Sequence, residues 1–157
     1  MFARFVVPAI LAAVAGGLVP YPVEAQEKVE PEGVVAYRIA VMRTLGAQMM
    51  GIKTALTETP EFRDNLVWHA RILQDASKIL PDLFPEGSNA PPSRTLPTVW
   101  EKKEEFEAAT KKMIELSAAF LETAQGGDPD ATMAAFARMG KQGCGGCHET
   151  FRSKQKR

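Results

Sequence analysis

Inward-facing positions recur every three or four residues along four stretches of this chain, the spacing that gathers side chains on one side of an α-helix. The stretches begin near Pro31, Thr59, Pro97 and Asp128. The positions that share a side in each stretch are, in order, Val35, Met42, Leu45, Met49, Ile52 and Leu56; Phe62, Leu66, His69, Leu73, Ala76 and Leu80; Val99, Phe106, Ala109, Met113, Leu116 and Phe120; and Met133, Phe136, Gly140, Cys144, Cys147 and Phe151. We find no strand pattern, so the sequence predicts four amphipathic helices.

Residues that start and stop helices stand at the ends of these stretches. Thr59-Pro60-Glu61 combines an N-cap residue, a proline at the first position and an acid in the first turn. Pro81 ends the second helix, and Gly126-Gly127 separates the third from Asp128-Pro129 at the start of the fourth. Two short connections and a third of about sixteen residues, 81–96, join the helices. This arrangement predicts an all-α fold, an antiparallel four-helix bundle.

The N-terminus has the pattern of a signal peptide. Arg4 precedes an apolar run over residues 5–20, and Val23-Glu24-Ala25 ends in the small-x-small manner that signal peptidase accepts. The alternative is a membrane anchor, but the run is short for a span and contains two prolines and two glycines. We therefore expect cleavage after Ala25, leaving residues 26–157 as one exported domain.

The total charge of the chain is balanced. The chain contains 19 basic and 19 acidic residues. This balance argues against nucleic acid or an anionic membrane as the partner, because both attract an excess of Lys and Arg.

The most specific motif is Cys144-Gly145-Gly146-Cys147-His148, close to the C-terminus. C-x-x-C-H is the attachment signature of a c-type haem, in which each thiol adds to a vinyl group and forms a thioether. On a helix these three side chains lie at i, i+3 and i+4, on one face. The histidine can then present a neutral imidazole to the iron. The sequence therefore predicts one covalently bound haem c.

Two other readings of the two thiols are weaker. A redox-active dithiol of the thioredoxin kind needs a βαβ setting, which this helical chain lacks. A zinc site would need more ligands than two cysteines and two histidines far apart in the sequence. We find no carboxylate pair, activated nucleophile or phosphate-binding loop, so we do not expect an enzyme.

Two polar residues occupy inward positions of the helices. Arg38 either extends its charge to water at the end of the bundle or meets a haem propionate or the distal pocket. His69 is either a core or boundary histidine with a hydrogen-bond partner or, as a minority reading, a second iron ligand. Leu83 and Phe84, in the long connection, either fold over an apolar pocket or close the end of the bundle.

The residues together resemble the class II c-type cytochromes, the family of cytochrome c′ and cytochrome c-556. The likeness covers residues 31–157 and rests on three stretches: Tyr37-Arg38 with Met42 four residues on, Leu96-Pro97-Thr-Val-Trp100, and Cys144-Gly-Gly-Cys147-His148-Glu-Thr-Phe151-Arg152. The position of the attachment motif at the C-terminus is part of the resemblance. The family resemblance implies a four-helix bundle, a periplasmic location and homodimers formed through the first two helices.

The resemblance also implies a role for each site residue. Cys144 and Cys147 form the thioethers, and His148 is the proximal iron ligand. Arg152 lies over the solvent-exposed proximal face of the haem, and Arg38 lies close to the haem.

Met42 falls where the family has its distal residue, facing the sixth position of the iron. In the c-556 branch a methionine binds the iron there and the protein is a low-spin electron carrier. In cytochrome c′ the site is open and accepts nitric oxide or carbon monoxide. We expect one-electron transfer with redox partner proteins, with Met42 as an iron ligand; the alternatives are gas binding and a thiol oxidoreductase that uses the two cysteines.

Overall fold

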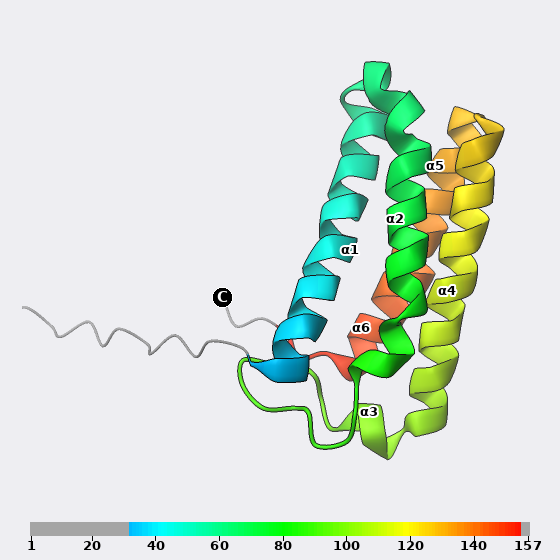
Figure 1. The fold of residues 1–157 in the computed structure, drawn as a ribbon. Coiled ribbons are helices and arrows are strands. Elements are labelled where there is room, and N and C mark those ends of the chain that lie inside the picture. Colours follow the sequence, from blue (N-terminus) through cyan, green and yellow to red (C-terminus); the bar gives the residue numbers. More distant parts are fainter. Residues whose placement is uncertain (1–31, 155–157) are drawn as a thin grey trace, which may run out of the picture.

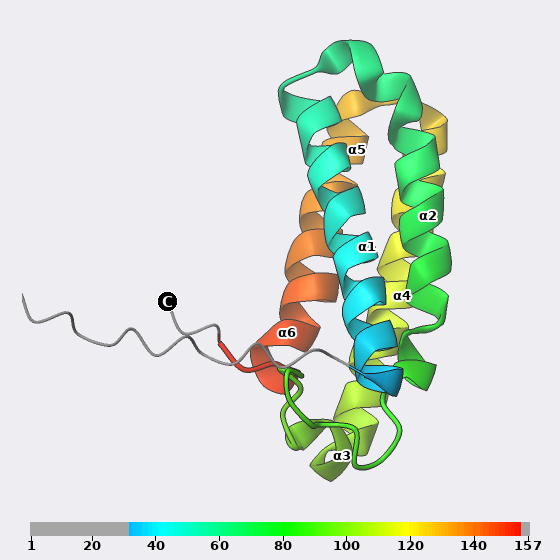
Figure 2. The same ribbon diagram turned by 60° about the vertical axis from the view of Figure 1, so that its left-hand side comes forward.

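Four helical rods, each antiparallel to its neighbours, make up the structure, a computed structural model that describes residues 32–154 (Figures 1 and 2). Within this range there is no β-strand, so the predicted all-α bundle is confirmed. The predicted signal peptide, residues 1–25, lies outside the described residues. None of the helices between residues 32 and 154 is long and apolar enough to cross a membrane.

Each rod of the bundle has defined bounds. The rods are α1 (Gly33–Thr57), α2 (Leu66–Lys78), α4 (Lys103–Gly126) and a C-terminal run of α5 (Pro129–Arg138), η3 (Met139–Gly145) and α6 (Gly146–Phe151). Shorter helical turns are η1 (Pro60–Asn65), η2 (Leu80–Leu83) and α3 (Thr98–Glu101). The C-terminal run is unbroken, but η3 is a π-helix, which the apolar spacing did not predict.

The boundary between α4 and α5 is built as predicted. Gly127 adopts φ 74°, a left-handed conformation that suits glycine at the end of a helix. The Asp128 carboxylate then accepts hydrogen bonds from the backbone N–H groups of Asp130 and Ala131 at 2.9 and 3.0 Å. These bonds satisfy donors that the first turn of α5 would otherwise leave free.

Two other predicted helix starts differ from the structure. The segment after Thr59 forms the 3₁₀ turn η1 before α2 begins, and Phe62 is 53% exposed, so its predicted inward position is wrong. The Thr59 hydroxyl donates to the Thr54 carbonyl at 3.3 Å instead of capping η1. The predicted third helix is divided into α3 and α4, because Lys102 leaves helical geometry with φ −121° and ψ 52°.

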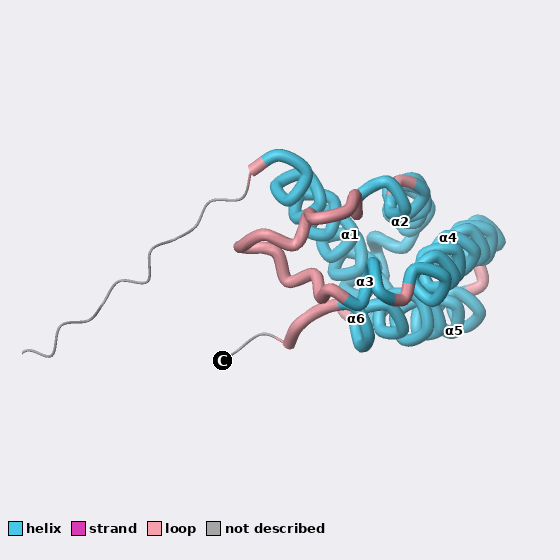
Figure 3. Tube along the Cα trace, turned by 90° about the horizontal axis from the view of Figure 1, so that it is seen from below, coloured by secondary structure: helices cyan, strands magenta, loops and turns pink. Residues whose placement is uncertain are grey.

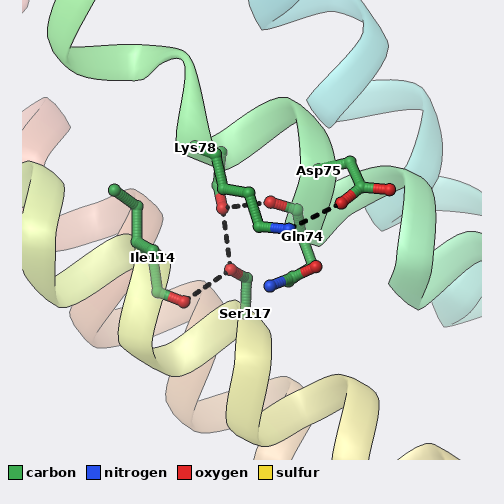
Figure 4. Close-up of polar contacts among 6 residues, drawn as sticks. Gln74, Asp75, Lys78, Ile114 and Ser117 are labelled. Carbon is green, nitrogen blue, oxygen red and sulfur yellow. Dashed lines mark hydrogen bonds and ion pairs between the residues drawn. The ribbon is translucent and has the colours of Figure 1, made fainter.

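The core lies between the four rods. Its main cluster takes buried side chains from α1, α2, α4 and η3, including Ile52, Leu73, Phe120 and Met139, each with no exposed surface. Figure 4 shows Ser117 of α4 facing α2, where its hydroxyl lies 2.8 Å from that of Ser77. Each hydroxyl also lies 2.8 Å from a carbonyl oxygen one turn back in its own helix, so both buried hydroxyls have partners: one donates to the other serine and the other donates to its own carbonyl.

A second, smaller cluster closes one end of the bundle. Val99, Phe106 and Phe151 are buried there, and the Phe106 ring packs edge-on against Phe84 and Phe151, with centroids 4.7 and 5.2 Å away. Leu83 is 2% exposed and belongs to the main cluster, while Phe84 contacts both clusters. Of the two alternatives for Leu83 and Phe84, the structure agrees with closure of the bundle end, because both side chains pack into these clusters. Figure 3 shows the connection that follows them crossing this end.

Candidate functional site

The C-x-x-C-H motif lies at the bundle end that carries α3 and α6 (Figure 1). Cys144 belongs to η3, whereas Cys147 and His148 belong to α6. Both thiols are free and half-buried. Cys144 packs against the main core cluster and Cys147 against the smaller one. The motif therefore faces the junction of the two apolar clusters, as the position of its cysteines in the apolar pattern predicted.

Glycine at position 143 lets the motif approach α4 closely. A Cβ atom placed on Gly143 would lie 2.7 Å from the Met113 sulfur and 3.6 Å from a Leu116 methyl group. A side chain there would displace the buried Met113 side chain from its packed position. The residue before Cys144 is thus held by direct packing, which fixes the height and rotation of the motif on the bundle.

Burial keeps the motif uncharged. It raises the pKa of Cys144, and it raises the pKa of Cys147 to about 11, with a further contribution from Cys144. Burial, together with the positive charges of Arg152 and Arg94, lowers the pKa of His148 to about 4. At neutral pH the imidazole is therefore neutral and keeps a nitrogen lone pair, as a metal ligand requires.

The residues after the motif pair with the long connection. Thr95 and Arg152 form an isolated antiparallel bridge. Around it, the Leu96 N–H donates to the Phe151 carbonyl at 3.0 Å and the Ser153 N–H donates to the Arg94 carbonyl at 2.8 Å. The connection is therefore tied to the chain three to five residues after His148.

Arg38 holds the same connection from the other side. Its side chain is 4% exposed and donates from Nε to the Leu83 carbonyl at 2.8 Å and from Nη1 to the Ser88 carbonyl at 2.8 Å. Nη1 also lies 3.1 Å from the hydroxyls of Ser93 and Thr95, and Nη2 donates to the Ser88 hydroxyl. Burial lowers the pKa of Arg38. Of the two alternatives for Arg38, extension to water is therefore wrong, because the connection folds over the side chain and supplies its acceptors.

Aromatic side chains complete the surroundings of Arg38. Its guanidinium carbon lies 4.4 Å from the centroid of the Phe84 ring, a cation–π distance. The Phe84 carbonyl in turn accepts a hydrogen bond from the Trp100 indole at 3.1 Å. These contacts fix Arg38 among neutral groups, and no carboxylate within residues 32–154 forms an ion pair with it.

Met42 lies one turn after Arg38 on α1 and is half-buried against the main cluster. Met49 gives the register of α1 against the C-terminal run, because its methyl group lies 3.4 Å from an ideal Cβ position on Gly140. The two helices are antiparallel (Figure 2). Met42 lies seven residues before Met49 on α1, and Cys147 lies seven residues after Gly140 on the C-terminal run. Met42 therefore stands at the level of Cys147 and His148.

His69 is far from this group. Its Nδ1 lies 2.7 Å from the Gln48 side-chain oxygen, and its ring packs over Gly51 on the outer side of α1 and α2. It is half-buried in a groove shared with Thr59 and Phe62, near the opposite end of the bundle. The structure thus gives His69 the role of a boundary histidine with a partner, not that of an iron ligand.

The sequence analysis did not identify the partners of Arg38. Ser88, Ser93 and Thr95 lie in a connection without periodicity, and nothing in their spacing marks them as acceptors. Arg94, which donates from Nη2 to the Ser153 carbonyl, was also missed. An unmatched charge on the inward side of α1 was the one indication that some other segment must supply acceptors.

The arrangement at this end fits a covalently attached haem. It offers two unoxidised thiols three residues apart, a neutral imidazole next to the second, and a glycine pair between them that adds no side chain. The apolar clusters on either side suit a macrocycle. The backbones of α1 and α2, of α2 and α4, and of α4 and the C-terminal run pack closely together. The backbones of α1 and the C-terminal run pack less closely, and Met42 lies on α1 beside this looser interface.

Comparison with known proteins agrees with this reading. The profile of the family described as Cytochrome C′ matches residues 33–152. A cytochrome c-554 of Cereibacter sphaeroides is 35% identical over 154 residues, covering 94% of this chain and 97% of that protein. A cytochrome c′ of Pararhodospirillum photometricum is 30% identical over 123 residues, covering 78% and 98%.

A solved structure has the same fold. Cytochrome c prime from Shewanella frigidimarina superposes with a TM-score of 0.72 at 24% identity, over 77% of this chain and 94% of that one. With a family match over most of its length and Cys144 and Cys147 available for the thioethers, this chain belongs to the class II c-type cytochromes, the cytochrome c′ family, and its cofactor is covalently bound haem c.

Proposed function

We propose that this protein is a periplasmic one-electron carrier with a single haem c, in which His148 is the proximal ligand and Met42 the sixth ligand of the iron. The observation that carries the proposal is the register of α1 against the C-terminal run. With Met49 against Gly140, Met42 stands opposite Cys147 and His148. The Met42 thioether on the facing helix would then serve as the second axial ligand of a haem held by Cys144, Cys147 and His148.

The bound haem supplies the redox chemistry, the exchange of one electron between ferric and ferrous iron. The chain's own residues prepare the site for it. His148 is neutral at physiological pH, so it coordinates without first losing a proton. A methionine thioether opposite a histidine raises the reduction potential relative to other ligand pairs, which suits a carrier.

Arg38 and Arg152 surround this site with positive charge. Arg38 is buried without an acidic partner in residues 32–154, so we infer that it offsets the charge of a haem propionate. Arg152 lies near His148, whose pKa it helps to lower, and we infer that it shields the proximal face. In both roles the arginine acts by its charge and position and takes no part in a chemical step. We therefore propose a carrier rather than an enzyme.

Gas binding is the second candidate, and the apolar character of α1 favours it. Val41 and Leu45 are buried near Met42 in the sequence, so a Met42 side chain that does not ligate would leave apolar side chains of α1 beside the sixth position. Such a pocket admits neutral diatomic gases. Binding of nitric oxide or carbon monoxide at low concentration would then be the main activity.

The outer side of α1 and α2 supports the homodimer that the family resemblance implies. A groove of about 340 Å³ is lined by small residues such as Ala47 and Gly51, next to Met50 and Phe62, which are 68% and 53% exposed. A groove and projecting side chains on the same face can pack against their own copies around a two-fold axis. We therefore propose that two copies associate through α1 and α2.

The carrier proposal is tested on the purified holoprotein. The intact mass should equal the polypeptide from residue 26 plus one haem, with no titratable thiol; a free thiol pair would instead support a thiol oxidoreductase. A potentiometric titration should show one reversible one-electron transition, and the ferrous protein should not bind carbon monoxide. Ready binding of carbon monoxide would contradict ligation by Met42 and favour gas binding.

A further inference from the structure

Charge in this neutral chain is strongly segregated. The last twenty residues, 138–157, contain six basic residues and a single acidic one, Glu149. The preceding 137 residues contain 13 basic and 18 acidic residues. The positive excess therefore coincides with the segment that includes the haem attachment motif, and no such clustering follows from a balanced composition.

Four of these six basic residues lie within residues 32–154, and the structure places all four at the surface. Arg138, Lys141, Arg152 and Lys154 are all exposed, and Arg94 joins them because its side chain donates to the Ser153 carbonyl. We call these five residues the basic face. Arg138 and Lys141 lie one turn apart where α5 meets η3, and the other three lie beyond α6 and in the connection paired with it (Figure 1). The five residues thus lie along the C-terminal rod and at the end that carries the motif, and Glu149 is the one acidic residue of that rod after Arg138.

Two of these charges lie close to the motif itself. Arg152 acts electrostatically on Cys144, Cys147 and His148, and Arg94 acts on His148. The Thr95–Arg152 bridge holds both arginines there through backbone pairing. A molecule that binds the basic face is therefore brought next to the residues that hold the haem.

The neighbouring surfaces differ in charge. The ion pairs within residues 32–154 join Lys78 to Asp75, Lys102 to Glu105 and Lys103 to Glu107, on α2 and at the start of α4. No ion pair in that range uses the four exposed residues of the basic face. Positive charge on one side and acidic excess elsewhere give a neutral protein a dipolar field, which orients an approaching charged partner.

We propose that the basic face is the docking surface for an acidic redox partner protein, which exchanges its electron with the haem at this end of the bundle. The proposal rests on the carrier function proposed above and names the chemistry of its partner. A protein fits better than an anionic membrane, because the exposed large apolar side chains of the described residues, Tyr37, Met50, Phe62, Trp68 and Ile72, all lie on α1, η1 and α2. The basic face has none to insert into lipid.

The first test measures binding without electron transfer. Holoprotein is eluted from a carboxymethyl resin with a salt gradient at pH 7, alongside Arg138→Glu/Lys141→Glu and the matched variant Lys111→Glu/Lys112→Glu on α4, which has the same net charge. We expect retention of the natural protein and of the α4 variant, and loss of retention for the basic-face variant. Equal loss in both variants would show that net charge, not the basic face, controls binding.

The second test measures electron exchange with small probes of opposite charge. Ferrous holoprotein passes one electron to ferricyanide, a trianion, or to tris(phenanthroline)cobalt(III), a trication, with no proton transferred. We expect the second-order rate constant with ferricyanide to fall as ionic strength rises and to fall roughly threefold to tenfold in the basic-face variant at low ionic strength. The cobalt complex should show the opposite trends, and reduction potentials are measured to correct for driving force.

The outcomes separate the two proposals. Fast exchange with both probes, with equal responses in the α4 and basic-face variants, overturns the docking surface and leaves the carrier function intact. A haem-loaded protein that exchanges slowly with both probes contradicts the carrier function itself. Cosedimentation with vesicles of anionic lipid at physiological ionic strength, lost only in the basic-face variant, would assign the face to a membrane and overturn the protein partner.

Discussion

The Arg38 guanidinium donates to both the carbonyl and the hydroxyl of Ser88, fifty residues further along the chain. These bonds join the first helix to the middle of the long connection. The connection is in turn paired, through Thr95, with Arg152 beyond the attachment motif. A continuous series of hydrogen bonds thus links α1, the helix of Met42, with the residues that follow His148.

Replacing Arg38 with lysine should destabilise the protein. Lysine keeps the charge but has one donor group in place of a planar fork, so it cannot serve Leu83, Ser88 and Thr95 together. Acceptors left without donors in a buried site cost about 2–3 kcal/mol of the free energy of unfolding. Urea unfolding of the holoprotein measures this loss. Arg43→Lys, at an exposed position of α1, is the control and should change stability by less than about 0.5 kcal/mol.

A methyl group at position 143 should also be destabilising. In Gly143→Ala the new Cβ meets the sulfur of the buried Met113, so that side chain must leave its packed position or α4 and η3 must move apart, at a cost of about 1–3 kcal/mol. Gly46→Ala on α1 has open space around it and should instead stabilise by roughly 0.5–1 kcal/mol, the usual gain for alanine within a helix. Thermal or urea unfolding compares the two variants. Equal gains would contradict the close packing of Gly143 on α4.

The proposed dimer predicts that a charge in its interface separates the subunits. Met50→Glu or Phe62→Glu places a carboxylate where apolar surface would be buried, so the sedimentation coefficient at micromolar concentration should fall to that of a monomer. Ala134→Glu, at an exposed position of α5, is the control and should leave the dimer intact. A natural protein that is already monomeric, or variants that remain dimeric, would contradict this interface.

The sequence was sufficient for the fold and for the attachment residues because both depend on local patterns. Helical spacing, the glycines at 126 and 127 and the capping Asp128 act over a few residues, and the structure contains each as predicted. The motif from Cys144 to His148 is recognised from the identity and spacing of its residues alone. The burial of Cys144 and Cys147 followed from their place in the apolar pattern.

The parts that could not be predicted depend on contacts between distant segments. The environment of Arg38 is made by Leu83, Ser88, Ser93 and Thr95, and their positions are set by how the connection folds over α1. The π-helix that includes Cys144 likewise has no marker in the apolar spacing. The exposure of Phe62 was missed because its position fits a helical stripe, whereas the chain there forms a 3₁₀ turn outside the core.

The most direct test of the central claim is the electron-spin-resonance and absorption spectrum of the ferric protein, compared with those of Met42→Ala and Met49→Ala. Both methionines are half-buried against the same core cluster, so the two variants lose similar packing. The account predicts low-spin iron in the natural protein and in Met49→Ala, and high-spin iron in Met42→Ala. A natural protein that is high-spin and shifts with carbon monoxide when reduced, or a Met42→Ala variant that remains low-spin, would contradict Met42 as the sixth ligand.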